Sequence, residues 1–290
     1  MVQPLRSINP RPKLVVCDFD GTLLNGPGPV SPAVRQAMQD VVDAGHWITV
    51  CTGRGYQLLK PFLGQFVVNA PLICCNGALI LEPDSLRPIF AAPTPLDVAH
   101  DAVRLAVTRG WRMLAYLADM QTLLYYGYSP FDPPQTARSG YQLVRDAEVV
   151  DEGLDPLTVI TGPLQKLMVL APRSGATPEF VSAIQGVVGD RARVVLSSPR
   201  AAELLVPGAS KAEGLKRVAR CVRVRRRDTI AIGDGDNDID MLRWAGVGIA
   251  MGNAMPAAKA IARWVAPPVD QDGVAAVLGR FLRGEIASAT

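Results

Sequence analysis

Short apolar runs alternate with amphipathic stretches along the first third of the chain. The runs are residues 13–17, 47–51 and 71–75, and each ends at a polar or small residue. Apolar runs of this length are typical of strands buried in a parallel sheet. Between them we expect a helix over residues 31–44, with Ser31 as N-cap and Gly45 closing it, and a further helical stretch to about residue 63. The alternation predicts a parallel sheet with helices on both faces.

The pattern changes between residues 83 and 205, where the predicted strands become amphipathic and paired. We expect a hairpin of residues 111–117 with 122–126, and two further strands at 165–170 and 193–196. Helices are expected at 96–109 and 178–188, and the loop 127–140 is rich in Pro, Gly and Ser. After residue 211 the alternation returns, with helices expected at 211–221, 237–244 and about 272–282 and strands at 229–232 and 246–250. The predicted fold class is therefore α/β: a Rossmann-like parallel sheet core of residues 1–83 plus 206–290, with an inserted α+β domain of residues 84–205.

Composition narrows the class of protein. The 290 residues are 49% hydrophobic and 20% charged with a net charge of +3, which is ordinary for a globular enzyme. The basic stretch 220–227 has no aromatic residues interleaved, so no nucleic-acid partner is expected. No apolar run approaches the ~20 residues that span a bilayer, and residues 1–13 do not resemble a signal peptide. We expect a cytoplasmic protein with five reduced cysteines and no membrane partner.

Two carboxylates stand where the first predicted strand ends. In the segment Asp18-Phe19-Asp20-Gly21-Thr22 they are two residues apart, so their side chains can share a face. One carboxylate can attack phosphorus as a nucleophile, and the other can protonate the leaving oxygen. A turn with two solvated aspartates would have the same composition.

A dense acidic loop follows the predicted strand 229–232. In Gly233-Asp234-Gly235-Asp236-Asn237-Asp238 the acids repel one another unless a cation lies among them, and oxygen ligands suit Mg²⁺. A calcium loop of the EF-hand kind is excluded, since Ile239 and Ala245 stand where the invariant Gly and the bidentate Glu belong. A dinucleotide-binding fingerprint is also not matched, because the third glycine of that motif is missing from this loop.

Two further segments can hold an anion. Thr52-Gly53-Arg54 offers a hydroxyl and backbone N–H groups at a helix start, although a plain N-cap threonine would look the same. Lys211 stands in the first turn of a predicted helix, where the macrodipole favours acids, and this mismatch suggests a task such as neutralising phosphate. An ordinary surface lysine is the alternative.

Taken in order, these segments resemble the motifs of the haloacid dehalogenase-like hydrolases, and the Cof-type phosphatases of subfamily IIB in particular. Asp18-x-Asp20-Gly-Thr is similar to motif one, Thr52-Gly-Arg to motif two, Lys211 to motif three and Gly233-Asp234-x-x-Asn237-Asp238 to motif four. Cys75-Asn76-Gly77-Ala78 and the run from Glu203 to Lys211 are further marks of the subfamily. Ala212 departs from the glycine usual after the lysine.

The resemblance implies a role for each motif. Asp18 is the expected nucleophile and Asp20 the general acid and base. Mg²⁺ is expected on Asp18, the backbone carbonyl of Asp20 and Asp234, with Asp238 ordering its waters. The residues expected to bind the phosphoryl group are Thr52, Gly53, Lys211 and Asn237. The residues expected near the substrate are Arg54, Asn76 and Gly77. The inserted domain would be a cap that closes over the site and selects the substrate.

The resemblance implies a phosphatase acting through an aspartyl-phosphate on a small phosphorylated metabolite, with a sugar phosphate expected first. Asp20 separates the chain from haloacid dehalogenases and ion-pumping ATPases, which lack an acid there. A phosphosugar mutase similar to phosphomannomutase stays an alternative. A non-catalytic phospho-acceptor domain is a second, although such a domain needs no lid. The substrate, the oligomeric state (monomer or dimer) and an oxidation-sensitive role for the strand-end cysteines, against simple core packing, stay open.

Overall fold

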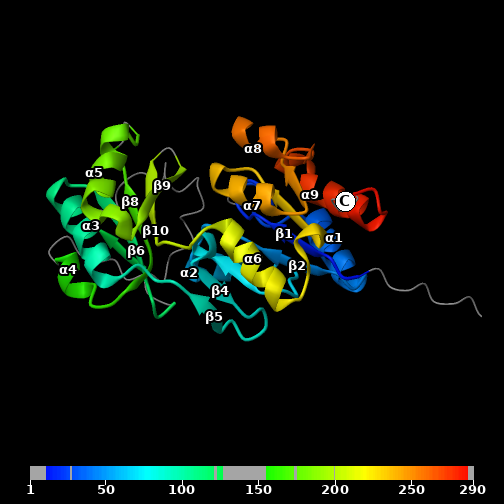
Figure 1. Cartoon of the computed structure of the whole chain (residues 1–290), viewed down its shortest axis with the longest axis horizontal. Coiled ribbons are helices and arrows are strands. Elements are labelled where there is room, and N and C mark those ends of the chain that lie inside the picture. The colour runs from blue at the N-terminus through cyan, green and yellow to red at the C-terminus, as the bar shows by residue number, and fades with distance from the viewer. Residues whose placement is uncertain are drawn as a thin grey trace, which may run out of the picture.

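Two lobes lie side by side along the long axis of the molecule (Figure 1). The computed structural model describes residues 11–26, 28–120, 123–126, 155–172, 175–198 and 200–286. One lobe contains a five-stranded sheet of order β13-β12-β11-β1-β2, and the other a five-stranded sheet of order β7-β6-β8-β10-β9, called here the second sheet. A three-stranded sheet, β3-β4-β5, extends the first lobe.

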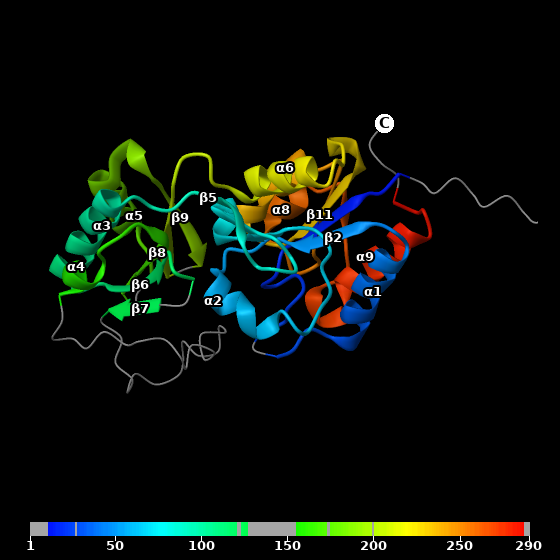
Figure 2. The same cartoon turned by 90° about the horizontal axis from the view of Figure 1, so that it is seen from below.

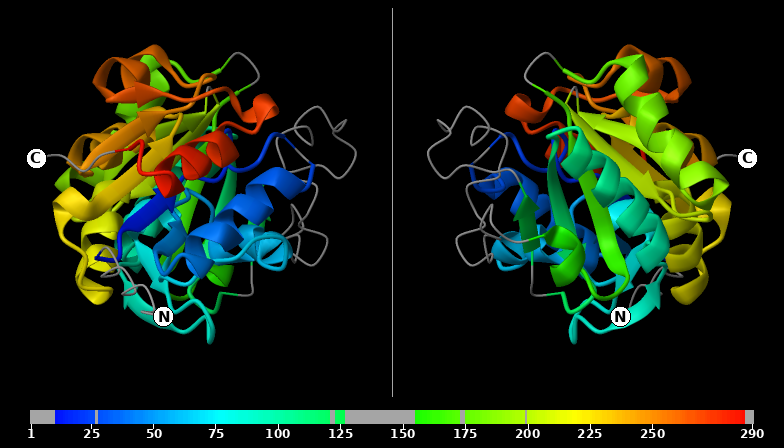
Figure 3. Two further views of the ribbon diagram at one scale, coloured as in Figure 1. Left: turned by 90° about the vertical axis from the view of Figure 1, so that its right-hand side faces the viewer. Right: turned by 90° about the vertical axis from the view of Figure 1, so that its left-hand side faces the viewer.

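The first sheet is parallel throughout, as the alternation of runs predicts. Its strands are β1 (Leu14–Cys17), β2 (Trp47–Val50), β11 (Thr229–Gly233), β12 (Val247–Ala250) and β13 (Trp264–Val265). Helices α1 (Pro32–Asp43) and α9 (Gly273–Leu282) pack together on one face, and α6 (Lys211–Cys221), α7 (Ile239–Trp244) and α8 (Pro256–Ile261) lie on the other (Figure 3). The strand side chains are buried between these helix layers, which explains their continuous apolar runs.

The first helix shows how local sequence sets an element boundary. Ser31 caps α1, since its hydroxyl oxygen accepts a hydrogen bond from the N–H of Val34 at 3.2 Å. Gly45 follows the helix with φ +79°, a conformation that costs glycine little. Both predicted ends of this helix are confirmed.

The third predicted strand differs from expectation on one edge. β3 (Leu72–Cys74) joins β2 only through a parallel bridge between Cys51 and Ile73, and its other edge pairs antiparallel with β4 (Leu79–Leu81), which pairs with β5 (Pro88–Ala91). Neither β4 nor β5 is predicted from the sequence. The chain reverses because three consecutive residues, Cys75, Asn76 and Gly77, have positive φ. This tight reversal replaces the longer crossover that a parallel neighbour would need.

The second sheet is antiparallel. Its strands are β6 (Arg112–Leu117), β7 (Leu123–Tyr126), β8 (Leu164–Leu170), β9 (Arg193–Ser198) and β10 (Ala201–Leu205), and its helices are α3 (Leu96–Thr108), α4 (Pro156–Val159) and α5 (Pro178–Val188). The expected β6–β7 hairpin is confirmed, and Met120, with φ +60°, supplies the left-handed turn residue in the absence of glycine. β10 was not predicted, and the expected loop 127–140 lies outside the described residues.

One short helix of the first lobe meets the second sheet (Figure 2). Helix α2 (Tyr56–Leu59), continued by a 3₁₀ turn at Lys60–Phe62, follows β2. Its Leu58 is buried in a cluster with side chains of the second sheet: Leu114, Tyr116, Leu123, Met168 and Ala201. The chain passes into the second sheet after β5 and returns after β10, while the predicted boundaries at 83/84 and 205/206 stay a prediction. Among the described helices, none has the length and apolar character needed to cross a bilayer.

Candidate active site

The segments selected from the sequence meet at one edge of the first sheet, where its parallel strands end. A cavity of about 430 Å³ opens there. The predicted site residues that line it are Asp18, Asp20, Gly53, Arg54, Lys211, Asp234 and Asn237. Its other wall comes from the second sheet and includes Tyr116, Lys166, Met168 and Glu203. Four predicted residues are not part of the lining: Thr52, Asn76, Gly77 and Asp238.

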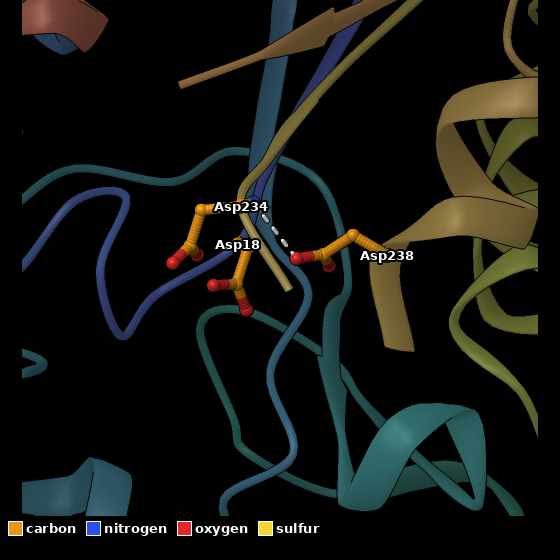
Figure 4. Close-up of side chains that lie close together, drawn as sticks. All are labelled: Asp18, Asp234 and Asp238. Carbon is orange, nitrogen blue, oxygen red and sulfur yellow. Dashed lines mark hydrogen bonds between the residues drawn. The ribbon is translucent and has the colours of Figure 1, made fainter. Parts of the chain in front are cut away.

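Asp18, Asp234 and Asp238 bring their carboxylates together, with one oxygen of each within 4.8 Å of the others. Figure 4 shows Asp18 and Asp234 leaving the ends of neighbouring strands, while Asp238 reaches in from the start of a helical segment. Lys211 joins two of the three, since its Nζ donates to Asp18 Oδ1 at 2.5 Å and to Asp238 Oδ1 at 2.6 Å. Only 1% of the lysine side chain is exposed, so the surface-lysine alternative is wrong.

Asp238 uses both of its carboxylate oxygens inside the protein. Oδ1 accepts from Lys211, and Oδ2 accepts from the backbone N–H groups of Asp234 and Gly235 at 3.0 and 2.9 Å. The side chain is fully buried. Asp238 therefore closes the acidic loop and fixes the lysine, which suits an indirect role toward a metal better than direct ligation.

The crowding of charge shifts the pKa values of this group. Burial, together with the carboxylates of Asp238 and Asp234, raises the pKa of Asp18 well above its usual range, against the opposing effect of Lys211. Burial and Asp238 also raise the pKa of Asp234, to about 6. Burial alone lowers the pKa of Lys211, but the carboxylates of Asp18 and Asp238 outweigh it, and the net pKa lies above the ordinary value. One ammonium does not balance three carboxylates.

A divalent cation fits this donor set. Asp18 and Asp234 offer hard carboxylate oxygens at the cavity wall, and their pKa values are raised first by burial and then by the neighbouring carboxylates, so a cation would stabilise both ionised groups. Asp234 is oriented from outside the cavity, because Thr22 Oγ1 donates to its Oδ1 at 3.0 Å. These residues could hold Mg²⁺.

Asp20 is held by Arg54. The guanidinium donates from Nε to Asp20 Oδ2 at 2.8 Å and from Nη2 to Oδ1 at 2.5 Å, so the pair is bidentate. Arg54 itself is fixed, since Nη1 donates to the carbonyl oxygen of Leu58 at 3.0 Å and the guanidinium lies over the rings of Phe19 and Phe62. Asp20 is 53% exposed and Arg54 10% exposed, so the arginine is the rigid member of the pair.

Thr52 is buried behind the cavity. Its hydroxyl oxygen accepts a hydrogen bond from the N–H of Arg54 at 3.0 Å, and its own N–H donates to the carbonyl oxygen of Ile73 at 2.8 Å. The hydroxyl orders the turn that presents Gly53 and Arg54. Gly55 is the N-cap of helix α2, so Thr52 is not the plain N-cap residue that the sequence left as an alternative. Its predicted contact with phosphate stays a prediction.

Asn76 and Gly77 connect the site to its surroundings. Asn76 is buried; its Nδ2 donates to Glu203 Oε2 at 2.8 Å, and its Oδ1 accepts from Asn237 Nδ2 at 3.1 Å. A Cβ on Gly77 would lie 2.1 Å from the carbonyl oxygen of Ser210, the residue before Lys211. Both residues therefore support the site from behind, through Asn237 and through the start of α6.

A buried ion pair in the second sheet faces the cavity. Lys166 Nζ lies 2.7 Å from Glu203 Oε1 and donates to the carbonyl oxygen of Gly53 at 2.5 Å. Both side chains are at most 3% exposed. With the Glu203–Asn76 hydrogen bond, this pair joins the second sheet to the first lobe at two points.

Some site residues were missed from the sequence. Asn253 follows β12, where its Nδ2 donates to the carbonyl oxygen of Gly21 at 2.8 Å and to Asp234 Oδ2 at 3.4 Å. The rule that placed Asp18 at a strand end also applies to Asn253 and could have found it. Tyr116 and Met168 had no such signal, because alternation in a strand says which side chains share a face and not what that face meets.

The strand-end cysteines are packing residues in this structure. Cys17, Cys51, Cys74 and Cys75 are buried, and burial raises the pKa of each thiol, which opposes thiolate formation. Only Cys221 is exposed. The packing interpretation is thereby favoured over oxidation sensitivity.

Comparison with known proteins confirms the family resemblance. The family profile of haloacid dehalogenase-like hydrolases matches residues 15–278. The chain is 29% identical over 284 residues to 5-amino-6-(5-phospho-D-ribitylamino)uracil phosphatase YitU of Bacillus subtilis, covering 94% of this chain and 97% of that protein. It is 24% identical over 271 residues to pyridoxal phosphate phosphatase YbhA of Escherichia coli, covering 91% and 96%.

Solved structures show the same fold. A subclass IIB sugar phosphatase of the haloacid dehalogenase superfamily superposes with a TM-score of 0.78 at 20% identity, over 94% of this chain and 100% of that one. The predicted α/β class and the Rossmann-like core are confirmed.

Proposed function

The chain belongs to the haloacid dehalogenase-like hydrolases, and we propose that it is a Mg²⁺-dependent Cof-type phosphatase whose nucleophile is Asp18. One observation carries the proposal. Asp18 lies at the wall of the cavity with its charge held by the buried ammonium of Lys211, and Asp234 is beside it. The names of the relatives support a phosphomonoester as substrate.

In the first step an Asp18 carboxylate oxygen attacks phosphorus and the bond from phosphorus to the leaving oxygen breaks. Asp20 gives its carboxyl proton to that oxygen, so the metabolite leaves as an alcohol and an aspartyl-phosphate remains. Lys211 donates to Asp18 Oδ1, which leaves Oδ2 as the attacking oxygen. The ammonium reduces the repulsion between the carboxylate and the incoming phosphate.

In the second step the Asp20 carboxylate takes a proton from water. The water oxygen attacks phosphorus, the bond from phosphorus to Asp18 breaks, and inorganic phosphate leaves with the Asp18 carboxylate restored. Gly53 and Asn237, which line the cavity, are proposed to bind the phosphoryl oxygens with Lys211, and Thr52 is proposed to order that loop.

Asp18, Asp234 and the backbone carbonyl of Asp20 would hold Mg²⁺, with Asp238 acting through its hydrogen bonds to the loop. The ion supplies charge neutralisation for the phosphoryl group when bound. Burial and the repulsion between the carboxylates raise the pKa values of Asp18 and Asp234, and a cation would oppose both effects.

The second sheet is proposed to be the cap that selects the metabolite, since Tyr116, Lys166 and Met168 face the catalytic residues across the cavity. The relatives act on chemically different phosphate esters, a ribitylaminouracil phosphate and pyridoxal phosphate. A sugar phosphate is our first candidate. Residues 84–205 remain the proposed extent of this domain, although β5 near its start pairs with β4 of the first lobe.

The rival functions differ in the fate of phosphate. A phosphosugar mutase moves the phosphoryl group to another oxygen of the sugar, whereas a phosphatase releases it to water. Membership in a hydrolase family argues against a non-catalytic phospho-acceptor domain.

A substrate panel tests the proposal. The purified protein is incubated with p-nitrophenyl phosphate, glucose 6-phosphate, fructose 6-phosphate, ribose 5-phosphate, 5-amino-6-(5-phospho-D-ribitylamino)uracil and pyridoxal phosphate, in Mg²⁺ or in EDTA, and inorganic phosphate is measured. We expect release in Mg²⁺ and none in EDTA. Isomerised sugar phosphate without released phosphate would instead identify a mutase.

A further inference from the structure

The second sheet contacts one short segment of the first lobe, residues 53–58, at three points. Lys166 donates to the carbonyl oxygen of Gly53 at 2.5 Å. Gly55 lies against the ring of Tyr116, so closely that a Cβ on Gly55 would be 2.5 Å from Tyr116 Cδ1. Leu58 is buried among side chains of the second sheet. The three contacts span the whole segment.

The same segment holds Asp20. Arg54 lies between the first two contacts and forms the bidentate pair with Asp20, while its Nη1 donates to the carbonyl oxygen of Leu58, at the third contact. The guanidinium is therefore fixed by the backbone that the second sheet covers. Asp20 is the more exposed partner and takes its position from Arg54.

We propose that the second sheet positions Asp20 through residues 53–58, with Gly55, Tyr116 and Lys166 as positioning residues and Arg54 as the link. When the second sheet packs against this segment, Arg54 holds the Asp20 carboxyl group at the cavity wall. To deliver the proton, one Asp20 oxygen exchanges its guanidinium hydrogen bond for an O–H directed at the leaving oxygen. The inference rests on the role proposed for Asp20. It adds that proton transfer depends on contacts made by the second sheet, away from the reacting atoms.

Gly55→Ala acts first on the contact with Tyr116, since the next atom that an added Cβ would meet, Gln57 Oε1, lies 3.1 Å away. Gly55 has φ −72° and ψ 164°, which alanine adopts without strain, so the methyl group acts only through its neighbours. Tyr116→Val removes the ring that the methyl group meets. Gly64→Ala is the matched control, because Gly64 is exposed, close in sequence, and has no atom within 4 Å of an added Cβ.

The readout is the dependence of rate on the leaving group. The alkoxide of a sugar phosphate needs a proton from Asp20, whereas p-nitrophenolate leaves without one. For Gly55→Ala we expect the rate of alcohol release in the first turnover, at saturating substrate, to decrease about tenfold or more with the fastest sugar phosphate of the panel. The same rate with p-nitrophenyl phosphate should change by less than about threefold, because that ester bypasses the general acid. The first turnover excludes the hydrolysis of the aspartyl-phosphate, in which Asp20 serves both esters as base.

Two further variants complete the test. Adding Tyr116→Val to Gly55→Ala should restore the ratio of the two first-turnover rates to that of Tyr116→Val alone, because the effects of two contacting residues are coupled. Arg54→Lys keeps the charge but loses the bidentate fork, and should also slow the first turnover of the sugar phosphate selectively. Melting temperatures and KM values are measured as well, to separate positioning from folding and binding.

Equal losses on both esters, or a Gly55→Ala variant indistinguishable from Gly64→Ala, would overturn the inference. Its failure is separable from failure of the proposed function. If Asp20→Asn selectively slows the first turnover of the sugar phosphate while Gly55→Ala and Arg54→Lys do not, the acid role of Asp20 stands and only the positioning route is wrong.

Discussion

At the scale of single residues, the position of Lys211 decides how three carboxylates can coexist. Its ammonium lies between Asp18 and Asp238, and it begins helix α6, where Ser210 is the N-cap. A lysine in the first turn opposes the helix dipole, and the sequence could show only that mismatch. The two short hydrogen bonds explain why the position is occupied by a cation.

Lys211→Met removes the cation and leaves Asp18 and Asp238 facing each other. We expect phosphate release to decrease at least about 10²–10³-fold, which is typical when one charge-stabilising group is removed from an active site. Lys216→Met is the control, since Lys216 lies on the same helix and pairs with Glu213 outside the cavity. Equal activities of the two variants would contradict the role of Lys211.

The pKa of Asp234 predicts how pH affects the stability of the metal-free protein. Because the folded pKa of about 6 lies above the ordinary value of 3.8, the folded state binds this proton more tightly than the unfolded state. The stability from this group is thus fully present below about pH 4 and is lost as the pH rises through about 6. We compare the free energies of unfolding of the wild-type protein and of Asp234→Asn in EDTA. The difference, wild type minus variant, should decrease as the pH rises from about 4 to about 7.

Thermal or urea unfolding at several pH values measures this difference. Mg²⁺ should reduce the decrease, because the cation competes with the proton for the same oxygens. A difference between the two proteins that does not change between about pH 4 and 7 would contradict the raised pKa.

At the scale of elements, the turn after β3 sets the start of α6. Gly77 has φ +89°, and its Cα lies so close to the carbonyl oxygen of Ser210 that there is no room for a Cβ. The helix therefore approaches the turn only because this residue is glycine. Gly214, whose added Cβ would meet Ile73 Cγ2 at 2.4 Å, allows the same close packing one turn later.

Gly77→Ala should displace α6 and with it Lys211. We expect a loss of more than about 1–3 kcal/mol of unfolding free energy, together with reduced phosphate release. Gly45→Ala has a similar positive φ of 79° but open space around its Cβ, so it isolates backbone strain, and it should keep its activity. Chemical denaturation and phosphate release are compared. If the two variants behave alike, close packing at Gly77 does not position the helix.

The elements differ in how well their sequences predict them. Helix 211–221 and strand 229–232 were predicted nearly to the residue, because caps and apolar runs are local signals. The strands β4, β5 and β10 were not predicted, because each is defined by its pairing with other strands and its own residues show no clear pattern. The reversal at residues 75–77 carried the dipeptide Asn76-Gly77 as a turn signal, whereas nothing in the sequence indicated that Cys75 also has positive φ.

At the scale of the whole molecule, the charged pair Lys166–Glu203 joins the two lobes. Lys166→Met leaves a buried carboxylate without its cation, and we expect a loss of about 3–5 kcal/mol in unfolding free energy. The double variant Lys166→Met/Glu203→Gln removes both charges and keeps an oxygen that can accept from Asn76. It should recover most of the loss in urea unfolding. A double variant no more stable than Lys166→Met would show that charge pairing is not the cause.

The two lobes differ in how much of the candidate site their sequences predict. The residues of the first lobe could be selected from the sequence, because the carboxyl ends of parallel strands meet at one edge. The wall formed by the second sheet could not, because the packing of one lobe on another leaves no periodic signal. In the structure, the side chains of this wall that line the cavity include Tyr116, Lys166, Met168 and Glu203.

The nucleophilic role of Asp18 is the central claim, and its direct test is phosphate release by Asp18→Asn. Asparagine keeps the size of the side chain and an oxygen for Lys211, but the amide cannot form the aspartyl-phosphate. With p-nitrophenyl phosphate and Mg²⁺, we predict turnover by the wild-type protein and none above background by Asp18→Asn. Full turnover by Asp18→Asn would contradict the covalent mechanism.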